Sequence, residues 1–135
     1  MSVKRGHCLC GEVTFEFEGE VNWAGHCHCE SCRRNTSSPM TSFLGVPNGK
    51  WRYTGETPKV YHSSPGVRRH FCGTCGSPMA FEADKFSHEI HFYAASLENP
   101  EDYTPQFHVF YREQLPWFEV KDDLPRHQGM SNGQG

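Results

Sequence analysis

The feature that most constrains this chain is its set of seven cysteines, which form two pairs and one triplet. The pairs are Cys8 with Cys10 and Cys72 with Cys75, and the triplet is Cys27, Cys29 and Cys32. Four thiolates suffice for a closed tetrahedral site, whereas three thiolates leave one position of a tetrahedral ion open. The cysteines therefore predict two metal sites of different kinds, one closed and one incomplete.

The two pairs use complementary spacings. A CxC spacing places both sulfurs on one face of an extended segment, and a CxxC spacing wraps a tight turn around an ion. Gly11 follows the first pair, and Gly73 and Gly76 lie within and just after the second, where the backbone must turn tightly. Each pair alone could simply be two small buried residues. Together they favour a structural Zn²⁺ that closes a long loop, so that metal binding contributes to folding.

The triplet leaves three interpretations open. An ion held by three thiolates keeps a position for water or a substrate thiolate, as catalytic zinc does. His28, His26 or another histidine could instead complete a closed site. Cys29 and Cys32 also form a CxxC pair, which is the spacing of a redox-active dithiol. We expect the first of these, a second and catalytic Zn²⁺ bound by Cys27, Cys29 and Cys32.

Length and charge limit the class of protein. A chain of 135 residues fits one small domain that a metal ion can stabilise. The formal net charge of −3 provides no basic excess for binding phosphates, so we expect no nucleic-acid partner. The N-terminus has no apolar stretch after its basic residues, and no run is long enough to cross a membrane, which predicts a cytoplasmic protein. Cytoplasmic thiols stay reduced, which favours metal or redox roles over disulfides.

Short strands dominate the expected secondary structure. Residues 12–18 alternate between apolar and polar side chains, which is typical of a half-buried strand. Residues 33–38 are expected to form no more than one helical turn, ended by Pro39. Further strand candidates, separated by turn residues, are 21–26, 40–46, 51–53, 59–62, 67–71, 79–82, 88–95, 107–111 and 117–120. We therefore predict a mostly β, small single domain over residues 1–125, followed by a disordered tail at 126–135.

Aromatic side chains are expected to fill the core of this domain. The large apolar candidates are Trp23, Phe43, Phe92, Phe107 and Trp117. Such side chains dominate the apolar area that a core can bury. We expect the strands at 107–111 and 117–120 to close the fold and to add aromatic mass to its core.

Three motifs in order resemble a known family. They are Gly6-His7-Cys8-Leu9-Cys10-Gly11-Glu12-Val13, Cys27-His28-Cys29-Glu30-Ser31-Cys32-Arg33-Arg34 and Phe71-Cys72-Gly73-Thr74-Cys75-Gly76-Ser77. The chain resembles the glutathione-dependent formaldehyde-activating enzyme family, which includes the centromere protein V domain. The resemblance implies a tent-like arrangement of several short antiparallel sheets. It also implies that the two pairs bind a structural zinc and that the triplet binds a catalytic zinc.

The resemblance implies the activity of a carbon-sulfur lyase, the reversible condensation of glutathione with formaldehyde to S-hydroxymethylglutathione. A small-molecule thiol such as glutathione is then the expected partner. Arg33 and Arg34 are candidates for binding a substrate carboxylate, because a guanidinium makes paired hydrogen bonds to it. His28 is a candidate for proton transfer near the metal, and the role of His108 stays open. Two other hypotheses are a non-catalytic zinc-stabilised module that binds a thiol metabolite or a protein, and a thiol redox sensor.

Overall fold

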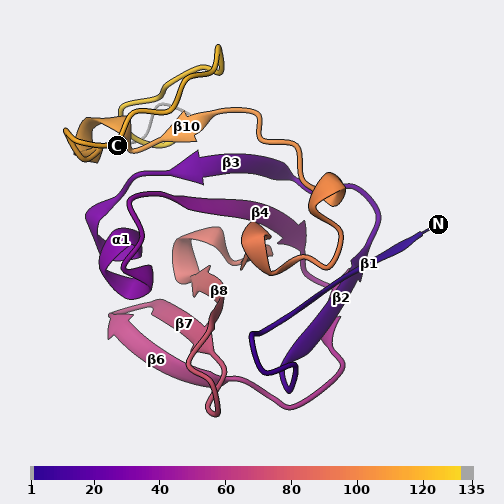
Figure 1. Cartoon of the computed structure of the whole chain (residues 1–135). Coiled ribbons are helices and arrows are strands. Elements are labelled where there is room, and N and C mark those ends of the chain that lie inside the picture. Colours follow the sequence, from indigo (N-terminus) through magenta and orange to yellow (C-terminus); the bar gives the residue numbers. More distant parts are fainter. Residues whose placement is uncertain (1, 132–135) are drawn as a thin grey trace. The chain divides into compact units, whose positions relative to one another are not determined.

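The structure is a computed structural model that describes residues 2–131 and consists largely of strands (Figure 1). Its residues fall into two compact units, each described here by itself. The first contains the residues up to Trp23 together with Leu44–Tyr103, and the second contains Ala24–Phe43 and the residues from Thr104 onward. Within the described part of the chain the single α-helix is α1, Glu30–Thr36. The prediction of a mostly β protein without a long helix is confirmed.

The first unit contains two sets of paired strands. In one set β1 pairs antiparallel with β2, and β2 pairs antiparallel with β5. In the other set β6, β7, β8 and β9 are antiparallel neighbours in that order, and β4 borders β9. The strands are β1 (Val3–His7), β2 (Thr14–Glu18), β4 (Thr41–Pro47), β5 (Trp51–Tyr53), β6 (Lys59–Ser64), β7 (Val67–Phe71), β8 (Pro78–Ala83) and β9 (Glu89–Tyr93). Of β4, the residues from Leu44 onward belong to this unit.

The second unit carries the cysteine triplet. Strand β3 (Trp23–Cys27) ends at the first cysteine of the triplet, and α1 begins three residues later (Figure 1). Strand β10 (His108–Val109) pairs parallel with β3, with His108 opposite His26 and Val109 opposite Cys27. A 3₁₀ helix at Tyr111–Glu113 follows β10 directly. The remaining 3₁₀ helices, in the first unit, are Asp84–Phe86, Ala94–Ser96 and Pro100–Asp102.

The core of the first unit is built on the alternation of β2. Phe15 and Phe17 are buried, whereas the glutamates between and after them are more exposed, as the sequence pattern predicts. The rings of Phe15 and Phe92 stack with their centroids 4.0 Å apart. Cys8 and Cys72 are part of the same buried cluster. The apolar core of this unit therefore adjoins one set of candidate metal ligands.

The polar residue Glu89 is buried in this unit with its hydrogen bonds satisfied. Its carboxylate accepts hydrogen bonds from Asn22 Nδ2 at 2.8 Å and from the Trp23 indole N–H at 2.7 Å, and it also contacts His91 Nε2. Burial raises the pKa of Glu89, but the hydrogen bonds from His91, Trp23 and Asn22 outweigh burial and lower it to about 2. The Trp23 indole thus donates to a buried carboxylate, so this predicted core residue does not pack only against apolar groups.

The predicted strand at residues 117–120 is wrong. The segment forms a turn, closed by a hydrogen bond from the Phe118 N–H to the Leu115 carbonyl at 3.2 Å. Pro116 explains the difference, because proline has no N–H for a strand ladder and favours a turn at this point. Trp117 is 71% exposed, so its predicted place in the core is also wrong.

The other expected elements are observed with shifted boundaries. Phe43 and Phe92 are buried as expected, and Phe107 is half-buried. The predicted helical turn at 33–38 is part of α1, which begins before it and ends where Ser37 adopts a left-handed φ of 56°. Strand β1 was not predicted, because its sequence Val-Lys-Arg-Gly-His lacks an alternation of apolar side chains.

The predicted boundary between a domain of residues 1–125 and a tail stays a prediction. Residues 126–131 are the part of the predicted tail that the structure describes, and this part makes hydrogen bonds to the strand and 3₁₀ helix around residues 108–111. The His127 N–H donates to the His108 carbonyl at 2.9 Å, and the Tyr111 N–H donates to the His127 carbonyl at 3.0 Å. Residues 132–135 of the predicted tail lie outside the described residues. No helix in residues 2–131 combines the length and the apolar character needed to cross a membrane.

Replacing the stacked core ring should be costly. Phe15→Ala is expected to lower the free energy of unfolding by about 3–5 kcal/mol, because it removes a buried aromatic side chain and leaves a cavity. The measurement is equilibrium unfolding in urea, with Val60→Ala on the exposed strand β6 as the control. Equal losses of stability in both variants would contradict this account of the core.

Candidate metal centres

The four paired cysteines converge in the first unit. The Sγ atoms of Cys8, Cys10, Cys72 and Cys75 all lie within 4.8 Å of one another. The distance from Cys10 Sγ is 3.6 Å to Cys8 Sγ and 3.7 Å to Cys72 Sγ. Four sulfurs at the usual zinc–sulfur bond length of a tetrahedral ion would be about 3.8 Å apart. The donor atoms and their spacing therefore fit a closed four-thiolate site.

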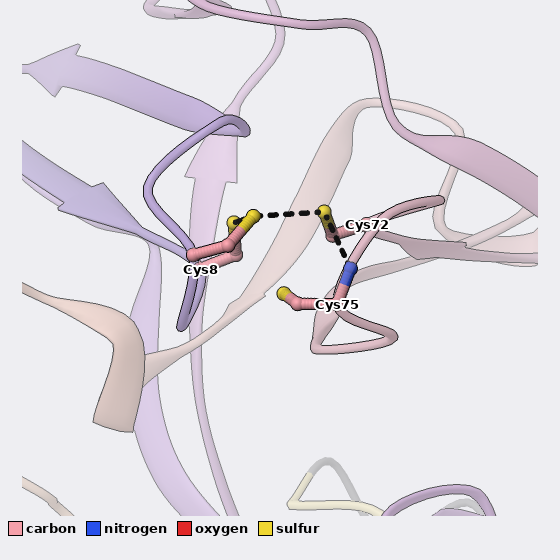
Figure 2. Close-up of side chains that lie close together, drawn as sticks. Cys8, Cys72 and Cys75 are labelled. Carbon is pink, nitrogen blue, oxygen red and sulfur yellow. Dashed lines mark hydrogen bonds between the residues drawn. The ribbon is translucent and has the colours of Figure 1, made fainter.

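Local turns position these four sulfurs. Gly11 and Gly76 have φ values of 84° and 80°, the left-handed region that glycine adopts at low cost. The CxxC turn lies between β7 and β8, as the sequence predicts, and Figure 2 shows the sulfurs of Cys72 and Cys75 directed toward that of Cys8. The N–H groups of Thr74 and Cys75 each lie 3.4 Å from Cys72 Sγ. These donors would stabilise a thiolate.

A hydroxyl group adds to the same effect at the last of the four. The Ser77 hydroxyl lies 3.2 Å from Cys75 Sγ, and this hydrogen bond lowers the pKa of Cys75 to about 5. Metal ligation requires the deprotonated thiol. Cys75 is therefore prepared for metal ligation by its own hydrogen bonds.

The cysteine triplet converges in the second unit. The Sγ atoms of Cys27, Cys29 and Cys32 lie within 4.8 Å of one another. Cys27 ends β3, Cys29 is the N-cap of α1, and Cys32 follows on the first turn of that helix. A separation of three residues places Cys29 and Cys32 on the same side of the turn. Cys27 and Cys32 are buried, whereas Cys29 is half-buried.

No fourth protein ligand joins the triplet in residues 2–131, because the group contains no further His, Cys, Asp or Glu. His26 and His28, the residues considered for closing the site, contact other partners. His26 Nδ1 lies 2.8 Å from Ser42 Oγ, and His28 Nε2 lies 2.8 Å from His108 Nδ1. Both rings pack against His108, with centroids 5.0 Å apart in each case. Since side chains alternate along a strand, Cys27 points to the face opposite His26.

The three thiols influence one another strongly. Hydrogen bonds with Cys27 and Cys32 lower the pKa of Cys29 to about 2. Hydrogen bonds to Cys29 and Cys32 raise the pKa of Cys27 well above its ordinary value. Hydrogen bonding among the three thiols therefore favours the thiolate form of Cys29 and the protonated form of Cys27.

A chain of polar contacts runs from the half-buried Asp122 through the buried His108 of β10 to the buried His28. Asp122 Oδ2 lies 3.0 Å from His108 Nε2, and His108 Nδ1 contacts His28 Nε2. Burial, followed by the charge of His108, lowers the pKa of His28 to about 4. The hydrogen bond from His108 lowers the pKa of Asp122. Sequence reasoning left His108 undecided and did not include Asp122, since nothing local marks a partner so far along the chain.

The two arginines that follow the triplet have different surroundings. Arg33 donates from Nε to the His28 carbonyl at 3.3 Å and from Nη2 to the Glu113 carbonyl at 3.2 Å. Arg34 is exposed and pairs with Glu30 at 2.8 Å. Glu113 also accepts a hydrogen bond from the Glu30 N–H at 2.9 Å, and no sequence signal pointed to this residue. Substrate-binding roles for Arg33, Arg34 and His28 stay predictions.

Comparison with known proteins identifies relatives of the chain. The family model described as glutathione-dependent formaldehyde-activating enzyme matches residues 3–113. This range contains all seven cysteines. An uncharacterized lyase of Schizosaccharomyces pombe is 33% identical over 76 residues, which cover 56% of this chain and 55% of the relative. The chain thus matches only about half the length of that protein.

A solved structure is also similar. A crystal structure of a Rhodobacter sphaeroides protein superposes with a TM-score of 0.60 at 27% sequence identity. The match covers 73% of this chain and 93% of that chain. The family match spans both cysteine pairs and the triplet, and the structural match supports the same fold. This chain therefore belongs to the glutathione-dependent formaldehyde-activating enzyme family.

Proposed function

We propose that this protein is a zinc-dependent carbon-sulfur lyase that acts on the adduct of a small thiol and an aldehyde. The observation that carries the proposal is the cysteine triplet, in which three convergent thiols have no fourth protein ligand within residues 2–131. Membership of the family supports a thiol such as glutathione and an aldehyde such as formaldehyde. The word lyase in the name of the S. pombe relative supports the reaction class.

The two cysteine groups would bind zinc ions with different roles. The four-thiol group of the first unit would hold a structural zinc, because four convergent thiolates suffice for a closed site. Cys27, Cys29 and Cys32 would hold a second zinc and leave one position for a ligand from outside the protein. Zinc bound in this way holds a thiol as a thiolate at neutral pH and polarises a carbonyl oxygen.

The net reaction joins two small molecules without oxidation or reduction. In the condensing direction a carbon–sulfur bond forms between the thiol sulfur and the aldehyde carbon, and the thiol proton ends on the former carbonyl oxygen. The reverse direction breaks the same bond and returns that proton to sulfur. The role of the protein is to bring sulfur and carbon together, which replaces a bimolecular encounter by a bound geometry.

The contacts of the two arginines favour one of them as the substrate-binding residue. The Arg34 guanidinium is exposed, and among residues 2–131 it forms a surface ion pair with Glu30, which contributes little to stability. It could therefore exchange this partner for a substrate carboxylate. Arg33 already donates to two backbone carbonyls. Of the two arginines, we therefore assign Arg34 to the carboxylate.

Metal content should separate the two groups. The wild-type protein is expected to contain about two zinc ions per chain. Cys29→Ser should lose about one zinc while keeping its thermal unfolding temperature near that of the wild type. Cys72→Ser should lose the other zinc and much of its folded population, because metal binding there closes a long loop and contributes to folding. Elemental analysis and thermal unfolding measure both, and loss of the fold in Cys29→Ser alone would contradict the assignment.

Turnover should depend on the triplet. With glutathione and formaldehyde, the wild-type protein is expected to accelerate formation and breakdown of the hydroxymethyl adduct, measured by NMR exchange between free and bound formaldehyde. Cys29→Ser should reduce the rate to that of the uncatalysed reaction, because one ligand of the open centre is lost.

Three outcomes would reject this function. Full activity of Cys29→Ser would show that the triplet is not catalytic. Calorimetric binding of glutathione without turnover in the wild type would favour the binding module, and reversible formation of a Cys29–Cys32 bridge without metal at the triplet would favour the redox sensor.

A further inference from the structure

Two hydrogen bonds connect the turn of the cysteine triplet to the 3₁₀ helix Tyr111–Glu113, and a third lies within the turn itself. The Glu113 carboxylate accepts from the Glu30 N–H at 2.9 Å. The Glu113 carbonyl accepts from Arg33 Nη2 at 3.2 Å. Arg33 Nε donates to the His28 carbonyl at 3.3 Å. Glu113 and Arg33 therefore form one connected brace across this turn.

Each contact of the brace lies next to a cysteine in the chain. His28 stands between Cys27 and Cys29, and Glu30 follows Cys29. Arg33 follows Cys32, and its own N–H donates to the Cys29 carbonyl at 3.1 Å within the helix. The brace therefore fixes the backbone on both sides of Cys29 and at the residue after Cys32.

The short helix α1 needs this support because the side chain of its N-cap residue is a thiol and not a capping oxygen. The helix has seven residues, and its N-cap, Cys29, makes no side-chain capping hydrogen bond. Helices of this length are marginal by themselves, and the usual cap is an oxygen of Ser, Thr, Asp or Asn. A residue of that kind at position 29 would remove a thiol of the triplet. The Glu113 carboxylate provides the missing acceptor from another segment, where a negative charge is also favourable.

Glu113 is itself held in place. The 3₁₀ helix Tyr111–Glu113 begins after Phe110, which adopts a left-handed φ of 53°. The Tyr111 N–H donates to the His127 carbonyl, and the Arg126 guanidinium lies 5.4 Å from the centre of the Tyr111 ring. The acceptor of the brace thus starts from a fixed backbone.

The geometry of Arg33 argues against a role in holding substrate. A guanidinium grips a carboxylate side-on through Nε and one Nη. In Arg33 the Nε and Nη2 atoms both donate to backbone carbonyls, and the side chain is part-buried. Arg34 makes no such contacts with the backbone and pairs with Glu30 at the surface. The two neighbouring arginines are therefore different in kind.

The geometry points to Glu113 and Arg33 as positioning residues that hold the cysteine triplet ready for a metal ion. Neither residue is proposed to touch the substrate or the ion. The inference rests on the metal site of the proposed function but not on the reaction catalysed there.

Zinc release tests the inference. With a colorimetric zinc chelator, the wild type should release one zinc faster than the other. Glu113→Ala and Arg33→Ala should accelerate the faster release about 10- to 100-fold, as expected when a supporting hydrogen bond of a metal ligand is lost. The slower release, from the four-cysteine group, should not change. The matched control is Arg52→Ala, which removes an exposed arginine that pairs with Glu16 in the first unit and should leave both release rates at their wild-type values.

Conservative variants separate positioning from mere folding. Glu113→Gln should release the zinc of the triplet at the wild-type rate, because the amide oxygen can still accept from the Glu30 N–H. Arg33→Lys should not, because an ammonium cannot reproduce the planar pair of donors. The absorption of Co²⁺ bound in place of zinc reports the same change in thiolate geometry without any turnover. These two variants keep the test decisive if an alanine variant fails to fold.

Three results would overturn the inference. The first is unchanged zinc release in Arg33→Lys and in the two alanine variants. A wild-type protein that binds no ion at the triplet is another. The third is an Arg33→Ala variant with normal zinc release but a raised KM for glutathione, which would make Arg33 a substrate-binding residue. Absence of lyase turnover in a wild type that shows the expected release rates would reject the proposed function and leave the positioning role intact.

Discussion

The interaction on which the first unit depends is the convergence of four thiols from opposite parts of its sequence. Cys8 and Cys10 follow β1, and Cys72 and Cys75 lie in the turn between β7 and β8. The sulfurs are spaced like the corners of a small tetrahedron, and two of them are buried in the same core as the stacked rings of Phe15 and Phe92. A metal ion bound here would connect the two ends of a long loop, so its binding free energy would be part of the folding free energy.

The second unit differs from the first because it brings together three thiols and no fourth ligand from the described residues. The end of β3, the N-cap of a short helix and the first turn of that helix deliver Cys27, Cys29 and Cys32. The helix cannot use its N-cap side chain for capping, since that side chain is a candidate metal ligand. Support from Glu113 and Arg33 resolves this conflict. Under the proposed function, a metal ion bound here would keep one position for a ligand from outside the protein.

The cysteine spacings were enough to predict both groups, because CxC, CxCxxC and CxxC each restrict where sulfurs can lie. Alternation along β2 likewise predicted Phe15 and Phe17 in the core. What could not be predicted depends on contacts distant in sequence. Glu113 lies 83 positions from Glu30, and no local pattern connects them. Trp117 was misplaced because its apolar character suggested burial, whereas the turn at Pro116 exposes it. Strand β1 was missed for another reason, because its basic sequence shows no alternation of apolar side chains.

The central claim is that one metal site is complete within the protein and the other is not. A crystal structure of the zinc-loaded protein, with anomalous scattering at the zinc edge and with and without glutathione, tests it most directly. The predicted result is two zinc ions, one bound by four cysteine sulfurs and one bound by Cys27, Cys29 and Cys32 with a non-protein ligand that the glutathione sulfur replaces. A protein side chain in that fourth position, unchanged by glutathione, would contradict the claim.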